Sequence, residues 1–295
     1  MGQRLIIVCR GKHMICSLLI HLIKFSQLYS FLKRNYITFT MKRKISLLLF
    51  IIPLLFINCS TINYSDIVVQ NDEHRAYLYG ESHGIQVIMQ KEIELWEDYY
   101  KNQNFRHLFL EVGYCDAQML NLWMQTGNDV FLDVILDNFR KTVNNGDERA
   151  EQNRWFYNEI KSKCPQTIFH GTDVQHQWQT GEWYKNYLKS LGSENAEEYS
   201  LALESIKSCE LYYVSKGETD EIFRENYMVS NFKREFDALP ATTKIMGIYG
   251  AQHTCFDTKN FTDEIDNMAT QLREYYLSKE GDIIFTQDIS KLKNR

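Results

Sequence analysis

The stretch that decides the fold is Arg75–Trp96, which reads RAYLYGESHGIQVIMQKEIELW. Its first five residues suit a short buried strand, and the glycines at 80 and 84 allow a sharp turn after it. From Ile85 onward the apolar residues recur every three or four positions, which is the period of an amphipathic helix. The stretch therefore predicts a strand, a polar turn and a helix, the repeating unit of α/β domains.

The same alternation continues along the chain. Strands are predicted at 75–79, 107–112, 167–170, 244–249 and 282–286. Helices are predicted at 85–96, 116–124, 130–140, 149–163, 183–191, 196–214, 220–239 and 261–277. Strands that alternate with helices imply an α/β fold with a mostly parallel central sheet flanked by helices. We expect the long helical stretch 174–239 to form a helical cap over one end.

The amino-terminal part differs sharply from the rest in charge. Residues 1–58 contain nine Lys or Arg and no Asp or Glu, which is typical of a targeting leader. We expect the true start at Met41 and a signal peptide at 41–58, with a basic beginning and a short apolar run. Cys59 follows directly, as in a lipoprotein signal, whose cysteine becomes the lipidated first residue. The alternatives are an ordinary secretory signal, an uncleaved anchor, or a genuine leader that includes residues 1–40.

The rest of the chain is acidic and continuous. Residues 59–72 look like a polar tether, and 73–295 like a single α/β domain, since no repeat or low-complexity segment interrupts them. The chain after residue 58 holds 24 basic and 38 acidic residues, a formal net charge of −14. This charge argues against a nucleic-acid partner. The expected partners are a small-molecule substrate and the membrane, through the N-terminal lipid. The expected location is the bacterial cell envelope, as a secreted, membrane-anchored lipoprotein.

Polar clusters follow four of the predicted strands. Because ligands bind beyond the carboxyl ends of parallel strands, we expect these clusters to converge on one crevice. Carboxylates and imidazoles together suit the activation of water or the binding of a metal. Each residue also has a structural alternative, because polar side chains after strands often cap helices. The residues expected in the crevice are Glu81, His83, Glu111, Asp173 and His253.

Two further features bear on the site. The sequence Gly80–Gly84 matches the nucleophile elbow G-x-S-x-G, with Ser82 as the nucleophile and Asp173 and His253 in triad order. In hydrolases with that elbow, a loop after an earlier strand contributes to the oxyanion hole, whereas here the elbow would follow the first predicted strand. A serine hydrolase therefore ranks below a histidine-centred site. On the predicted helix 220–239, Arg224 and Asn231 share a face, which is either a binding face or a solvated one.

The chain resembles the erythromycin esterase-like family, part of a wider group that includes ChaN-like haem-binding lipoproteins and the TIKI/TraB proteins. The resemblance spans nearly all of the chain from Arg75 to His253. It is carried, in the family's order, by Tyr79–Gly84, Phe109–Glu111, Gly171–Asp173, Arg224–Asn231 and Gly250–Thr254.

The resemblance implies a cleft at the strand ends and a role for each motif. His83 is implied to act as general base on a water, and Glu81 and Glu111 to orient that histidine, the water or the substrate. Arg224 and His253 are implied to line the same cleft. The paired Gly80-x-x-His83 and Gly250-x-x-His253 also look like the metal-linked motifs of the TIKI/TraB group. The chain departs from the family in having Arg224-Glu225 where Arg-Asp is usual, and in a domain that is short for a macrolide esterase.

These observations lead to one main hypothesis and two alternatives. The main one is a hydrolase that uses a His83-activated water on an ester or related bond. The first alternative is a haem- or small-ligand-binding lipoprotein without catalysis, and the second is a serine hydrolase through Ser82. No cofactor is expected for the hydrolase. A divalent metal, which His83 and His253 would hold, and haem both remain open as alternatives. Residues predicted to contact substrate without taking part in the chemistry are Asp173, Asn231 and Ser82.

Overall fold

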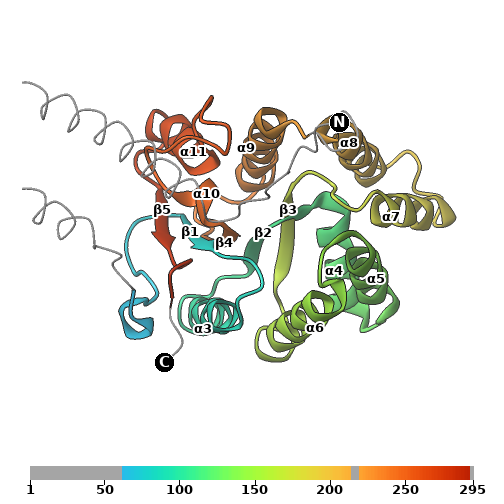
Figure 1. The fold of residues 1–295 in the computed structure, drawn as a ribbon, viewed down its shortest axis with the longest axis horizontal. Coiled ribbons are helices and arrows are strands. Elements are labelled where there is room, and N and C mark those ends of the chain that lie inside the picture. The colour runs from blue at the N-terminus through green and yellow to red at the C-terminus, as the bar shows by residue number, and fades with distance from the viewer. Residues whose placement is uncertain (1–61, 214–218, 293–295) are drawn as a thin grey trace, which may run out of the picture. The chain divides into compact units, whose positions relative to one another are not determined.

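A five-stranded parallel sheet forms the centre of the protein (Figure 1). The computed structural model describes residues 62–213 and 219–292. The strand order is β3-β2-β4-β1-β5, and every pairing is parallel, which confirms the predicted sheet. The strands are β1 (Ala76–Glu81), β2 (His107–Gly113), β3 (Ile168–Asp173), β4 (Ile245–Gly250) and β5 (Ile284–Asp288).

The strand order creates a switch point between β1 and β4. The chain leaves β1 toward β2 on one side of this pair, and it leaves β4 toward β5 on the other side. In open α/β sheets the connections diverge at such a point and leave a crevice beyond the strand ends. The register pairs Ala76 with Ile245 and Glu81 with Gly250, so β1 and β4 end side by side.

Helices cover both faces of the sheet because the strands alternate their side chains. Tyr77 and Tyr79 point into one apolar cluster, whereas Ala76 and Leu78 point into another on the opposite face. The first face is covered by α3 (Gln86–Asn102), α4 (Tyr114–Thr126) and α6 (Gly146–Lys163), with α5 (Val130–Thr142) packed on α4 and α6. The opposite face is covered by α9 (Glu221–Asp237) and α11 (Met268–Leu277).

The predicted helical cap at 174–239 is only partly a separate layer. Helices α7 (Trp178–Ser190) and α8 (Glu197–Tyr212) pack on each other and on α4, on the β3 side of the sheet (Figure 1). Helix α9, by contrast, lies on the sheet itself, with Phe232 and Phe236 fully buried against Phe109 of β2. The apolar stripe of α9 is the reason, because it must be buried against a hydrophobic surface.

The last predicted helix begins later than expected. The sequence predicts a helix at 261–277, but α11 starts at Met268, after the short α10 (Ala251–Thr254) and a loop. Asn267 caps α11 by accepting a hydrogen bond from the backbone N–H of Thr270. Its amide also donates to the carbonyl oxygens of Gln252 and Cys255, which ties the loop to α10.

The predicted tether at 59–72 is not a free segment over the residues that the structure describes. Ile67 is fully buried in the core, and the backbone N–H of Gln70 donates to the Tyr99 hydroxyl. The predicted leader at 1–58 and Cys59 lie outside the described residues. Within 62–213 and 219–292, no helix combines the length and the apolar character needed to cross a bilayer.

Candidate functional site

The carboxyl ends of four strands bring the predicted site residues together. Glu81 ends β1, with His83 in the turn that follows, and Glu111 lies near the end of β2. Asp173 ends β3, and His253 lies in α10, directly after β4. The site therefore lies at the switch point between β1 and β4, where the strand pattern placed it.

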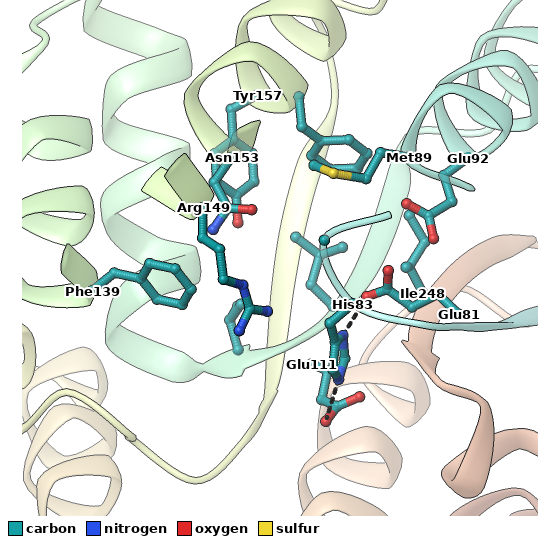
Figure 2. A pocket seen from close by; sticks show the side chains of 14 residues that line it. Glu81, His83, Met89, Glu92, Glu111, Phe139, Arg149, Asn153, Tyr157 and Ile248 are labelled. Carbon is teal, nitrogen blue, oxygen red and sulfur yellow. Dashed lines mark hydrogen bonds and ion pairs between the residues drawn. The ribbon is translucent and has the colours of Figure 1, made fainter. Parts of the chain in front are cut away.

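His83 is held by one carboxylate and faces another. Its Nδ1 lies 2.7 Å from Oε1 of Glu81, and its Nε2 lies 3.7 Å from Oε1 of Glu111 (Figure 2). The side chain is 47% exposed, so the imidazole contacts solvent while its Nε2 faces Glu111. The negative charge of Glu111, with a smaller contribution from Glu81, raises the pKa of His83 to about 11. At neutral pH this pKa leaves most of the imidazole protonated.

His253 has the same arrangement but is buried. Its Nδ1 lies 2.8 Å from Oε2 of Glu225, and its Nε2 lies 3.6 Å from Oε1 of Glu111. Burial lowers the pKa of His253, but Glu111 and Glu225 outweigh burial, so the pKa is raised overall. Two imidazoles, each tied to its own carboxylate through Nδ1, thus direct Nε2 at a single oxygen of Glu111.

Glu111 is the centre of this network. Its Oε1 accepts a hydrogen bond of 2.5 Å from Nη2 of Arg224, and its Oε2 accepts one from the backbone N–H of Gly250. Burial would raise the pKa of Glu111, but the two histidines and Arg224 hold it well below its usual range. A Cβ on Gly250 would lie 3.2 Å from Nε2 of His83 and 3.3 Å from Oε2 of Glu111, so a larger residue would crowd both side chains.

Arg224 joins Glu111 to a second buried carboxylate. Its Nε lies 3.0 Å from Oδ1 of Asp173, and its Nη2 lies 2.6 Å from Oδ2. Asp173 is fully buried, and the guanidinium of Arg224 with the nearby His176 keeps its pKa below the ordinary value despite burial. The Nη1 nitrogen of Arg224 forms no hydrogen bond to the described residues, so it is available to a ligand.

Two adjoining cavities open onto this network. The larger is about 300 Å³ and the smaller about 150 Å³, and His83 and Glu111 line both. Arg224 and Asp173 line the larger one, and Glu81 the smaller one. Figure 2 shows His83 in the wall of the smaller cavity, opposite side chains of α5 and α6. Ligand pockets commonly begin at about 300 Å³, so this site suits a small ligand.

Two predicted substrate-binding residues lie elsewhere. Asn231 is buried, donates to the carbonyl oxygen of Thr172 and accepts from Arg234, so it supports β3 rather than lining a cavity. Ser82 is exposed and lines neither cavity. A serine triad is not assembled either, because Asp173 bonds to Arg224 and His176, whereas the acid partner of His253 is Glu225.

Three residues of the network were not singled out from the sequence. The sequence marked Glu225 only as a departure from the family pattern, whereas the structure shows it buried with its carboxylate against Nδ1 of His253. His176 follows Asp173 by three residues and lies 3.0 Å from its Oδ2. Glu92 of α3 is buried beside Glu81, and burial together with the charge of Glu81 raises its pKa well above the usual value. No pattern in the sequence marks Glu92 apart from its place on the apolar face of α3.

The network does not suit a divalent metal. The positive guanidinium of Arg224 already lies against the oxygen of Glu111 at which both imidazoles point. A cation between the imidazoles would meet this charge at close range. Across 62–213 and 219–292, no group of three His, Cys, Asp or Glu side chains is arranged to hold a metal ion.

The fold and the site define an α/β protein with a histidine–carboxylate–arginine cleft at the switch point of a parallel sheet. Solved structures with a similar fold include an erythromycin esterase, EreC, in the open conformation of a histidine mutant. EreC is 12% identical with a TM-score of 0.47, over 74% of this chain and 70% of EreC. A Bacillus cereus protein is 14% identical with a TM-score of 0.45, over 74% of this chain and 66% of its own.

ChaN of Campylobacter jejuni, whose structure is described as binding haem cofacially, is 12% identical with a TM-score of 0.35, over 73% of this chain and 81% of ChaN. No protein-family model and no curated protein sequence matches the chain.

Proposed function

We propose that the protein is a hydrolase that cleaves an ester of a small substrate with a water activated at His83. The observation that carries this proposal is the position of His83, with Nδ1 fixed by Glu81 and Nε2 open to the cavity beside Glu111. A carboxylate on Nδ1 orients the ring and fixes its tautomer, which leaves Nε2 to exchange protons with water or substrate.

The reaction follows from these positions. Neutral His83 takes a proton from water at Nε2 while the water oxygen attacks the ester carbonyl carbon. The charge that develops on the carbonyl oxygen is stabilised by the free Nη1–H of Arg224, which lines the larger cavity. The bond between carbon and the alcohol oxygen then breaks, and His83 returns its proton to that oxygen. The products are a carboxylic acid and an alcohol.

The pKa of His83 gives this mechanism a sharp pH dependence. Only the neutral imidazole can act as base, and with a pKa of about 11 its fraction rises about tenfold per pH unit across the neutral and mildly alkaline range. We therefore expect kcat/KM for a small ester to rise with a slope near one from about pH 6 to about pH 9. The rate of the His83→Ala variant, subtracted at each pH, removes hydrolysis by free hydroxide.

A different pH profile would overturn the role of His83 as base. A kcat/KM that is flat or falls across this range would mean that the protonated imidazole is the active form. His83 would then act as an acid or as an electrostatic stabiliser, and another group would have to activate the water.

A second candidate function is the binding of a small ligand without catalysis. The protonated state of His83 favours it, because an imidazolium beside an open cavity attracts an anion. The same state disfavours haem ligation by His83, since a histidine must be deprotonated to bind iron. Absence of hydrolysis across small esters, together with saturable anion binding, would support this second function.

We also propose that Cys59 anchors the protein to a bacterial membrane through a lipid. The basic and apolar run before Cys59 supports this proposal. In cells fed a labelled fatty acid, the full-length chain should carry the label and sediment with membranes, whereas Cys59→Ser should carry none. Labelling of Cys59→Ser equal to that of the unaltered chain would exclude this anchor.

A further inference from the structure

One face of α6 lines the site with hydrogen-bond donors. Arg149, Asn153 and Tyr157 follow one another at intervals of four residues, which places them on one side of the helix. All three line both cavities, together with His83 and Glu111. Figure 2 shows these three side chains across the cavity from His83.

Arg149 is unusual among the arginines of this acidic protein. Eight arginines lie in the described ranges, and six of them form ion pairs with carboxylates. Arg106 donates to carbonyl oxygens and to Gln166. Arg149 has no ion pair or hydrogen bond to any described residue, and its guanidinium lies 5.6 Å from the ring of Phe139.

Arg149 also lies next to the turn that carries His83. A Cβ built on Gly84 would lie 3.4 Å from Nε of Arg149, so the guanidinium packs against this turn. The φ of Gly84 is +73°, a conformation that glycine adopts without strain. Arg149 therefore lies beside His83.

The other two residues of this face also lack a hydrogen-bond partner among the described residues. Neither the amide of Asn153 nor the hydroxyl of Tyr157 forms a hydrogen bond within 62–213 and 219–292. Burial raises the pKa of Tyr157, so its hydroxyl stays a neutral donor. Tyr157 is buried and Asn153 half-buried, and both line the two cavities, so these groups can bond to a ligand or to water.

The acidic wall of the cavity has the opposite character. Glu81 bonds to His83, Glu111 to Arg224 and Gly250, and Asp173 to Arg224 and His176. These three carboxylates thus already have cationic or N–H partners, whereas Glu92 and Asp116, which also line the cavities, each keep one buried oxygen without a partner among the described residues. The α6 side offers three hydrogen-bond donors, and that of Arg149 carries a full positive charge and cannot accept a hydrogen bond.

We propose that Arg149, with Asn153 and Tyr157, forms an anion subsite, and that the substrate carries a carboxylate or phosphate next to the bond that is cleaved. Guanidinium groups bind both anions through paired hydrogen bonds. This proposal deepens the proposed hydrolase function and rests on it for the role of the bound anion in catalysis.

The kinetic test compares two esters that differ only at one end. One ends in a carboxylate and the other in the matching carboxamide, and both are given to the full-length chain and to Arg149→Gln. We expect KM for the carboxylate ester to rise about 10- to 100-fold in the variant, as for loss of a charge-assisted hydrogen bond, with kcat changed about twofold or less. KM for the carboxamide should not change.

Two further variants serve as controls. Arg154→Gln removes an arginine of the same helix that pairs with Asp133 and lines neither cavity, so it should leave both KM values unchanged. Arg149→Lys keeps the charge but loses the paired geometry, so its KM should lie between those of the unaltered chain and Arg149→Gln. A rise in KM for both esters in Arg149→Gln would show a structural effect and overturn the subsite.

A binding test separates this inference from the hydrolase function. Succinate and inorganic phosphate are titrated calorimetrically into the full-length chain and into Arg149→Gln. Binding of either anion that is lost in Arg149→Gln supports the subsite even if no ester is cleaved, and the anion that binds identifies the group. If neither anion binds and both esters are cleaved equally well, the subsite is wrong while the hydrolase function stands.

Discussion

Replacement of His83 by alanine is expected to lower kcat for ester hydrolysis about 10²- to 10⁴-fold, the usual contribution of a positioned base. The side chain is 47% exposed, so its loss should leave the fold intact. Initial rates on a panel of small esters, with circular dichroism of both proteins, provide the measurement.

Ser82 supplies the matched control. It lies next to His83 in the same turn, is exposed and lines neither cavity, so Ser82→Ala should retain nearly all of the activity. Equal losses of activity in the two variants would instead support Ser82 as a nucleophile. Full activity in His83→Ala would remove His83 from the chemistry altogether.

Replacement of Arg224 by methionine is expected to lower the free energy of unfolding by about 3–5 kcal/mol, as when one partner of a buried ion pair is removed. Glu111 and Asp173 would be left as two buried carboxylates facing each other without the guanidinium between them. Urea denaturation of the full-length chain, followed by circular dichroism, measures the change.

The pH dependence of this loss tests its electrostatic origin. In the unaltered protein the pKa of both carboxyls is lowered, so their stabilising contribution is present above the usual carboxyl pKa and is lost as the pH falls through the folded values. The variant should therefore lose most stability at about pH 8 and less at about pH 5, where protonation begins to remove the stranded charge.

As a control, Arg154→Met breaks a surface pair with Asp133 and should cost about 1 kcal/mol or less. A loss of similar size in both variants would contradict a special role for the buried network.

The sequence predicted the sheet and the convergence of most candidate residues at the strand ends, because both depend on local patterns. Strands such as 107–112 show a short apolar run before a polar turn, and the polar residues after four such runs converge, as parallel strands require. Glu111 was the clearest case, because an acidic residue directly after Leu110 needs a partner when it is buried.

Partners that come from other elements could not be predicted in this way. The pairing of His253 with Glu225 depends on how α9 lies on the sheet, and the position of Arg149 beside Gly84 depends on how α6 packs. Neither packing arrangement produces a periodic pattern in the sequence around Glu225 or Arg149. Asn231 shows the converse, since it shares a helix face with Arg224 but lies two turns further along α9 and does not reach the cavity.

The central position of β4 has a consequence for how the protein is made. β4 lies between β1 and β2 in the sheet but follows both of them, and β3, in the chain. Until Ile245–Gly250 has left the ribosome, β2 lacks one neighbour, β1 lacks both, and Glu111 lacks the backbone N–H of Gly250. Pairings between residues so distant in sequence are slow to form, and unpaired strand edges invite association with other chains. A nascent or truncated chain that stops before β4 thus lacks part of its site and exposes unpaired strand edges, which favour aggregation.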